Sequence, residues 1–124
     1  MNALQITLSD DKSRFAPGDK IDGKAYWRME KPPESLEIRL FWYTEGKGTQ
    51  DVKIADALRF DAPGRQEERS FNLKLPVEPY SFSGSLISLN WALELVATPG
   101  GQTQRLDIVM SPTKEEILLI RNQQ

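Results

Sequence analysis

The chain has 124 residues, contains neither cysteine nor histidine, and balances 16 basic against 18 acidic side chains, for a net charge of -2. That length suits one domain that buries a core without disulfide bonds, and the two missing residue types exclude thiol chemistry and serine–histidine nucleophiles. The charge balance argues against a general nucleic-acid partner, because phosphate binding requires a basic surface.

The first predicted elements are two strands separated by a polar turn. Leu4, Ile6 and Leu8 alternate in a short first strand. The second strand, over residues 21–29, alternates between two faces. Its inward set is Ile21, Gly23, Ala25, Trp27 and Met29, and its outward set is Lys24, Tyr26 and Arg28.

Three glycines are expected to serve backbone geometry and not ligand binding. Gly18 follows a proline and precedes an acid, the arrangement of a type II turn whose third position needs positive φ. Gly23, inside a strand pattern, indicates a bulge or a close backbone approach. Gly84 is expected to have positive φ in the turn before a later strand.

Lys31-Pro32-Pro33 ends the second strand, and the period of two continues through the rest of the chain. A third strand alternates between inward Leu36, Ile38, Leu40 and Trp42 and outward Glu37, Arg39, Phe41 and Tyr43. The fourth places Val52, Ile54, Leu58 and Phe60 in one phase, interrupted at Asp56, which we interpret as a bulge. Three later strands carry Phe71, Leu73 and Leu75; then Ile87, Leu89, Trp91, Leu93 and Leu95; then Leu106, Ile108 and Met110.

Seven strands without a convincing helix predict an all-β, immunoglobulin-like, two-layer antiparallel β-sandwich. The large side chains that share a phase within the three long strands should form its core. They are Trp27, Leu40, Trp42, Leu89, Trp91 and Leu93.

Three motifs together resemble the arrestin-like superfamily. They are Pro17-Gly18-Asp19 followed by Ile21 and Gly23; Leu75-Pro76 with the turn from Pro79 to Gly84; and the strand from Leu86 to Trp91. The resemblance is to the N-terminal arrestin-like domain, as found in bacterial sporulation-control proteins and retromer-type subunits. It implies one arrestin-like sandwich over residues 1–110, followed by a C-terminal segment, 111–124. Because these motifs are turn and core positions, they imply no ligand residues.

The search for catalytic groups assigns none. The paired acids Asp10-Asp11, Glu67-Glu68 and Glu115-Glu116 are sequence neighbours that diverge on an extended backbone, whereas glycosidase carboxylates must face one sugar. The acids after residue 9 lack the spacing of a calcium loop, and Gly46-Lys47-Gly48-Thr49 lacks the spacing of a phosphate loop. We therefore expect no enzyme activity, no cofactor and no metal.

An aromatic stripe on the outer face is the feature that suggests a partner. If the third strand turns its aliphatic residues inward, Phe41 and Tyr43 point outward, and Tyr26 with Arg28 is expected on a neighbouring strand. Exposed tyrosine and arginine are enriched at contact surfaces. The predicted partner surface is Tyr26, Arg28, Arg39, Phe41 and Tyr43, unless another strand or the tail covers it.

The C-terminal segment holds the consecutive aliphatics Ile117, Leu118, Leu119 and Ile120, which are too apolar to remain in water. A strand is favoured over a short helix capped at Ser111. We expect the segment to pack on the sandwich or, as the alternative, to pair with a second copy through an exposed edge, giving a homodimer.

Two functions from different classes follow. The first is a non-catalytic protein-interaction module with an unidentified protein partner, and the second is a carbohydrate-binding sandwich that stacks sugars on Tyr26, Phe41, Tyr43 or Tyr80. Residues 1–20 lack a signal-peptide pattern, and no apolar run reaches the length of a membrane span. We therefore expect a cytoplasmic protein, which favours the first function.

Overall fold

Strands form almost all of the regular structure, as the period of two predicts. The computed structural model describes residues 2–46, 50–84, 86–99 and 101–119. Its elements are β1 (Ala3–Leu8), the 3₁₀ helix η1 (Ser9–Asp11), β2 (Arg14–Phe15), β3 (Lys20–Arg28), β4 (Ser35–Gly46), β5 (Val52–Phe60), β6 (Gln66–Lys74), β7 (Phe82–Gly84), β8 (Ile87–Thr98), β9 (Gln102–Met110) and β10 (Ile117–Leu119).

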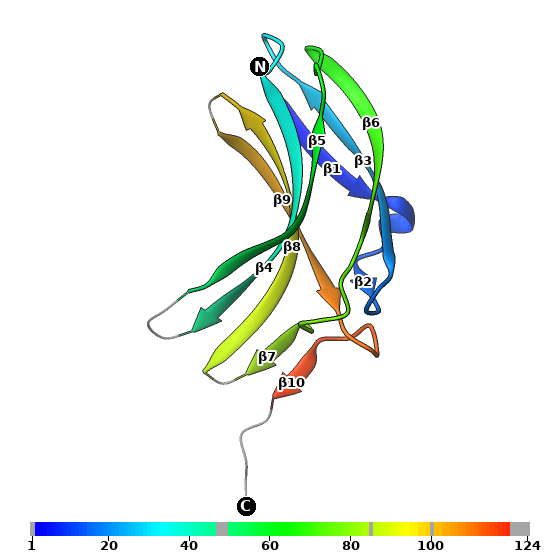
Figure 1. The fold of residues 1–124 in the computed structure, drawn as a ribbon, viewed down its shortest axis with the longest axis vertical. Helices are drawn as coiled ribbons and strands as arrows, with labels where there is room; N and C mark the ends of the chain where they lie inside the picture. The colour runs from blue at the N-terminus through cyan, green and yellow to red at the C-terminus, as the bar shows by residue number, and fades with distance from the viewer. Residues whose placement is uncertain (1, 47–49, 85, 100, 120–124) are drawn as a thin grey trace, which may run out of the picture.

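The strands form two layers (Figure 1). The small sheet has the order β1-β3-β6, with both pairings antiparallel. In the large sheet β5, β4 and β8 are consecutive, and the far edge of β8 is shared between β9 and β7. The predicted two-layer sandwich is confirmed. Two short parallel pairings, β2 with β9 and β10 with β7, are additional to it.

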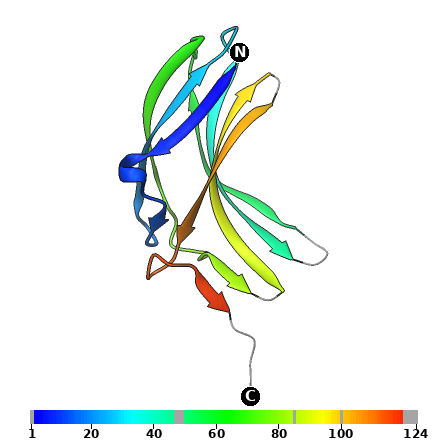
Figure 2. The same ribbon diagram turned by 180° about the vertical axis from the view of Figure 1, so that it is seen from behind.

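The core fills the space between the inward faces of the two sheets. Trp27, Leu40, Trp91 and Leu93 are fully buried, and Leu89 is nearly so, as predicted. Trp42 packs against this core but is only partly buried. The large sheet extends beyond the small one at its lower end, which holds the end of β4, the start of β5, β7 and β10 (Figures 1 and 2).

The two sides of the sandwich differ. On one side β1 lies against β9. On the other, β5 and β6 are the edge strands of their sheets and do not pair with each other. An edge strand leaves one row of backbone N–H and C=O groups unpaired.

The special backbone geometry predicted for three glycines is confirmed at two of them. Gly18 has φ +78°, and the Asp19 N–H donates to the Ala16 carbonyl at 3.1 Å, which closes the type II turn. A Cβ on Gly23 would lie 2.4 Å from the Thr7 carbonyl oxygen, so β1 and β3 approach closely there. The prediction for Gly84 is wrong, because Gly84 belongs to β7 and lacks positive φ.

A β-bulge divides β5. Asp56 is opposite Leu40 and Ile54 is opposite Phe41, so Ala55 is the extra residue. The predicted interruption at Asp56 is therefore confirmed. The expectation that Val52 and Ile54 share the inward phase of Leu58 is wrong, because the extra residue turns them to the outer face of the large sheet.

The C-terminal segment forms the expected strand at Ile117–Leu119, which pairs with β7. The buried Ser111 hydroxyl holds the preceding turn: it accepts from the Glu115 N–H at 2.9 Å and donates to the Glu115 carbonyl. Leu118 is nevertheless 69% exposed. Ile120 lies outside the described residues.

Candidate interaction surface

The five predicted surface residues fall into two groups. Tyr26 and Arg28 lie on β3 of the small sheet, whereas Arg39, Phe41 and Tyr43 lie on β4 of the large sheet. Because β3 pairs with β1 and β6 and not with β4, the expected continuous stripe does not form. The outward faces of two stacked sheets point in opposite directions, so the β3 residues and the β4 residues lie on opposite faces of the sandwich.

Phe41 and Tyr43 of the β4 group belong to an apolar patch on the outer face of the large sheet, here called the β4–β5 patch. It consists of Phe41, Tyr43, Val52, Ile54 and Ala92. Phe41 is opposite Ile54 on β5 and Ala92 on β8, and Tyr43 is opposite Val52. Cross-strand partners share a face of a sheet, so these side chains are neighbours.

Within the patch, the aromatic rings form a floor and the aliphatic side chains form an exposed rim. The ring centroids of Phe41 and Tyr43 are 6.0 Å apart, and the two side chains are only 8% and 6% exposed. Val52 and Ile54 are 62% and 51% exposed. The sequence missed this rim because the single extra residue in β5 reverses its face.

Charged groups surround the patch. The Arg105 guanidinium lies 4.9 Å from the centre of the Tyr43 ring, and Arg105 pairs with Asp107 at 3.4 Å. Burial, and then the negative charge of Asp107, raise the pKa of Tyr43, so its phenol stays neutral at physiological pH. Arg39 pairs with Glu37 on the same strand.

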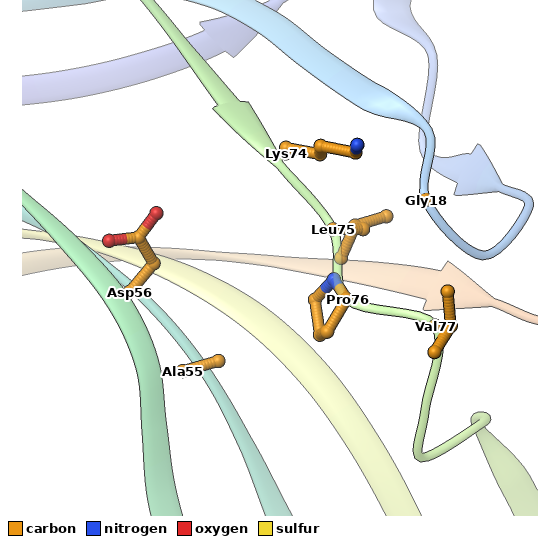
Figure 3. Close-up of a pocket in the computed structure, with 7 residues that line it drawn as sticks. All are labelled: Gly18, Ala55, Asp56, Lys74, Leu75, Pro76 and Val77. Atoms are coloured by element: carbon orange, nitrogen blue, oxygen red, sulfur yellow. The ribbon is translucent and has the colours of Figure 1, made fainter.

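A cleft of about 410 Å³ opens between the β5 bulge and the β6–β7 linker (Figure 3). Its lining residues are Gly18, Ala55, Asp56, Lys74, Leu75, Pro76 and Val77. The Asp56 carboxylate accepts from the Ala57 N–H at 2.8 Å and forms no ion pair with any described residue. In Figure 3 the Lys74 amino group points toward Gly18 and away from Asp56. The cleft is a polar-rimmed recess with apolar walls.

The other exposed large hydrophobic side chains belong to segments near the lower end of the large sheet. They lie on the β6–β7 linker, at the start of β8 and on β10: Val77, Tyr80, Leu86, Ile87 and Leu118. The small sheet does not cover this end (Figure 2). Among the residues that the structure describes, the large exposed hydrophobic side chains are therefore concentrated toward this end of the large sheet.

Across residues 2–46, 50–84, 86–99 and 101–119, no three acidic side chains come together in a way that could hold a metal ion. Within the same ranges, no helix has the length and apolar character needed to cross a bilayer.

Among solved structures the chain is similar to Spo0M, a sporulation control protein from Bacillus subtilis. The TM-score is 0.63 and the sequence identity 15%, over 89% of this chain and 49% of the Spo0M chain, so the chain spans about half of Spo0M. A β-glucosidase from Listeria innocua matches with a TM-score of 0.49 at 10% identity, over 95% of this chain and 16% of the enzyme. No protein-family model matches the chain, and no curated protein sequence matches it. The Spo0M likeness shows that the two chains share a fold, and this fold is the two-layer β-sandwich that the sequence predicts.

Proposed function

We propose that this chain is a non-catalytic, cofactor-free interaction module and that a protein partner docks on the β4–β5 patch. The observation that carries the proposal is the exposed apolar rim, Val52 and Ile54, next to an ordered aromatic floor. Contiguous apolar area on a soluble domain usually marks a contact surface. A cysteine-free chain fits the reducing cytoplasm, which we propose as its compartment.

The energetics of the patch favour binding. Covering an exposed valine or isoleucine side chain completely contributes about 1.5–3 kcal/mol. Phe41 and Tyr43 are already packed, so a partner that touches their exposed edges orders few additional side chains. The surrounding Arg39, Glu37, Arg105 and Asp107 supply the polar rim that is typical of protein–protein interfaces.

The carbohydrate alternative receives less support. A sugar platform needs ring faces open to solvent, but Phe41 and Tyr43 are almost fully covered. Tyr26 lies on the other sheet, and Tyr80 lies on the β6–β7 linker. The four proposed stacking rings therefore do not form one groove.

The proposal is tested by recovering partners from native lysate with the wild-type protein and with two variants, Val52→Lys and Ile54→Lys. A lysine in the rim would place a charge against the partner's apolar surface, so recovery of the specific partner should fall by about tenfold or more. Thr103→Lys is the matched control, because Thr103 lies on β9 of the same sheet, away from the patch.

All variants should retain the melting temperature of the wild type, because the substituted positions are exposed. Equal recovery of the same proteins by the wild type, the patch variants and the control would contradict the proposal.

A further inference from the structure

We propose that a second copy of this chain pairs with the free edge of β5. The two β5 strands run antiparallel about a two-fold axis, and Lys53 of each copy lies beside Asp56 of the other. This inference does not depend on the proposed function, because edge pairing leaves the outer face of the sheet open.

The edge of β5 is available. The strand pairs only with β4, and every residue from Val52 to Ala57 is exposed. The β6 strand across the open side belongs to the other sheet. A two-fold dimer joins the same element of each copy, so the sequence of β5 must complement itself.

The bulge makes this self-pairing geometrically consistent. In a regular strand, residues 53 and 56 face opposite sides and could not be cross-strand partners. Here Lys53 is opposite Trp42 and Asp56 is opposite Leu40, both on the inner face. The extra residue Ala55 therefore lets Lys53 of one copy face Asp56 of the other on the same side of a continuous sheet.

The same register is complementary in charge and in size. It makes two Lys53–Asp56 pairs, one on each side of the two-fold axis. On the outer face it places Val52 of one copy opposite Ala57 of the other, a large residue against a small one. Opposite charges across neighbouring strands are stabilising, and like charges there are destabilising.

The cleft beside the bulge can receive the incoming lysine. Asp56 lies on one wall without an ion-pair partner among the described residues, and the cleft holds about 410 Å³ (Figure 3). Pro76 and Val77 offer apolar surface to the methylene stem of the lysine, and its ammonium group can reach the carboxylate.

These features also make the edge selective. A bulge and an inward-facing charge normally protect an edge strand from arbitrary pairing. A second copy carries the matching bulge and a lysine in register with that charge, whereas an unrelated strand carries neither.

The test is the mass of the wild-type protein in solution, measured by sedimentation from about 10 µM to 1 mM, because a single short strand pairing makes a small, weak interface. The mass is expected to rise from 14.1 kDa toward twice that value. In a dimer of the Lys53→Glu variant, each cross-strand pair would bring two acids together. In a dimer of the Asp56→Lys variant, each pair would bring two lysines together, so each variant alone should remain monomeric.

An equimolar mixture of these two variants should dimerise again, because both cross-strand pairs are then opposite in charge. Lys74→Glu, on the cleft wall but outside the pairing register, is the matched control and should dimerise like the wild type. The proposal is overturned if the wild type stays monomeric at 1 mM, if either variant alone dimerises like the wild type, or if the mixture stays monomeric.

A second measurement uses the absence of cysteine from the chain. The variants V52C and A57C, mixed and oxidised, should cross-link to each other faster than either links to itself, because only the mixed pair is directly opposed. Equal cross-linking rates for V52C alone, A57C alone and their mixture would contradict the proposed register. A monomeric wild type that still binds its partner through the β4–β5 patch would refute this inference alone.

Discussion

One hydrogen-bonded cluster joins the ends of the two edge strands. The Trp27 indole N–H donates to the Gly64 carbonyl at 2.9 Å, and the Glu67 carboxylate accepts from the Gly64 N–H and from Arg69. The Arg69 guanidinium lies 5.8 Å from the Trp27 ring centre and 5.7 Å from that of Phe60. A single carboxylate thus fixes the β5–β6 connection.

The pH dependence of stability should report this carboxylate. The Gly64 N–H, and then Arg69, lower the pKa of Glu67 below its ordinary value of 4.5. A carboxylate whose pKa is lower in the folded state than in the unfolded state stabilises the folded state when the pH is above the unfolded pKa. This contribution disappears as the pH falls through the folded pKa. Glu67→Gln should therefore be less stable than wild type in urea at pH 7, and the difference should shrink at about pH 3.

The matched control is Glu68→Gln, because Glu68 is an exposed neighbour whose partner, Lys24, is 3.8 Å away. It should change stability little at either pH. If Glu67→Gln lost the same amount of stability at pH 7 and at about pH 3, the lost interaction would not depend on the charge of the carboxylate.

For single residues, the sequence predicts roles that depend on adjacent residues and misses roles that depend on residues far away in the chain. Pro17-Gly18-Asp19 signals its own turn, and the predicted positive φ at Gly18 is present. Nothing near Glu67 indicates its role, because the indole that shares Gly64 with it lies 37 residues from that glycine.

Among the elements, β10 is the one whose contribution is most easily measured. It pairs with β7 over three residues, and the Ile117 N–H donates to the Ser81 carbonyl at 3.3 Å. Deleting residues 112–124 would remove this pairing and leave the buried Ser111 hydroxyl without Glu115. The melting temperature should fall by about 3–5 °C for each kcal/mol lost.

A shorter truncation, of residues 120–124 only, is the matched control, because it retains all of β10. It should melt close to the full chain in a calorimetric scan. If the longer deletion left the melting temperature unchanged, β10 would contribute nothing to stability.

Strand positions could be predicted because each strand carries its own alternation and turn residues, but register could not. The acid at position 56 signals a bulge in β5. Which neighbour is the extra residue depends on the pairing with β4, and that choice decides whether Val52 and Ile54 face inward or outward. The sequence therefore predicted only part of the β4–β5 patch. Alternation in β4 predicted that Phe41 and Tyr43 face outward, but alternation in β5 did not predict that Val52 and Ile54 do so.

For the whole molecule, the layers were predictable and the sheet membership was not. Alternation in several strands requires two apolar faces to meet, and this is what the structure shows. Alternation does not determine which strands are neighbours. β3 pairs with β1 and also with β6, whose paired residues lie 38 to 54 positions further along the chain, so Tyr26 and Phe41 lie on different sheets.

Hydrogen exchange of the dilute protein should reveal the unpaired edges of β5 and β6. The strands β3, β4 and β8 are paired on both edges, whereas β5 and β6 are paired on one. Alternate amides of β5 should therefore exchange much faster than those of β4, and the slowest amides should lie in β3 and β8. Uniform protection of β4 and β5 would show that the open edge is covered in solution.

The bulge in β5 also has a consequence for how the chain can be compared with its relatives. Loss of Ala55 alone would remove the bulge and leave every pairing of β5 with β4 unchanged, so Lys53 would stay on the inner face and Val52 and Ile54 on the outer face. A homologue without this residue would therefore keep the same two surfaces, and its sequence would need a one-residue gap opposite Ala55. An alignment that omits this gap would match inward residues with outward ones along half of the strand and would assign both surfaces incorrectly.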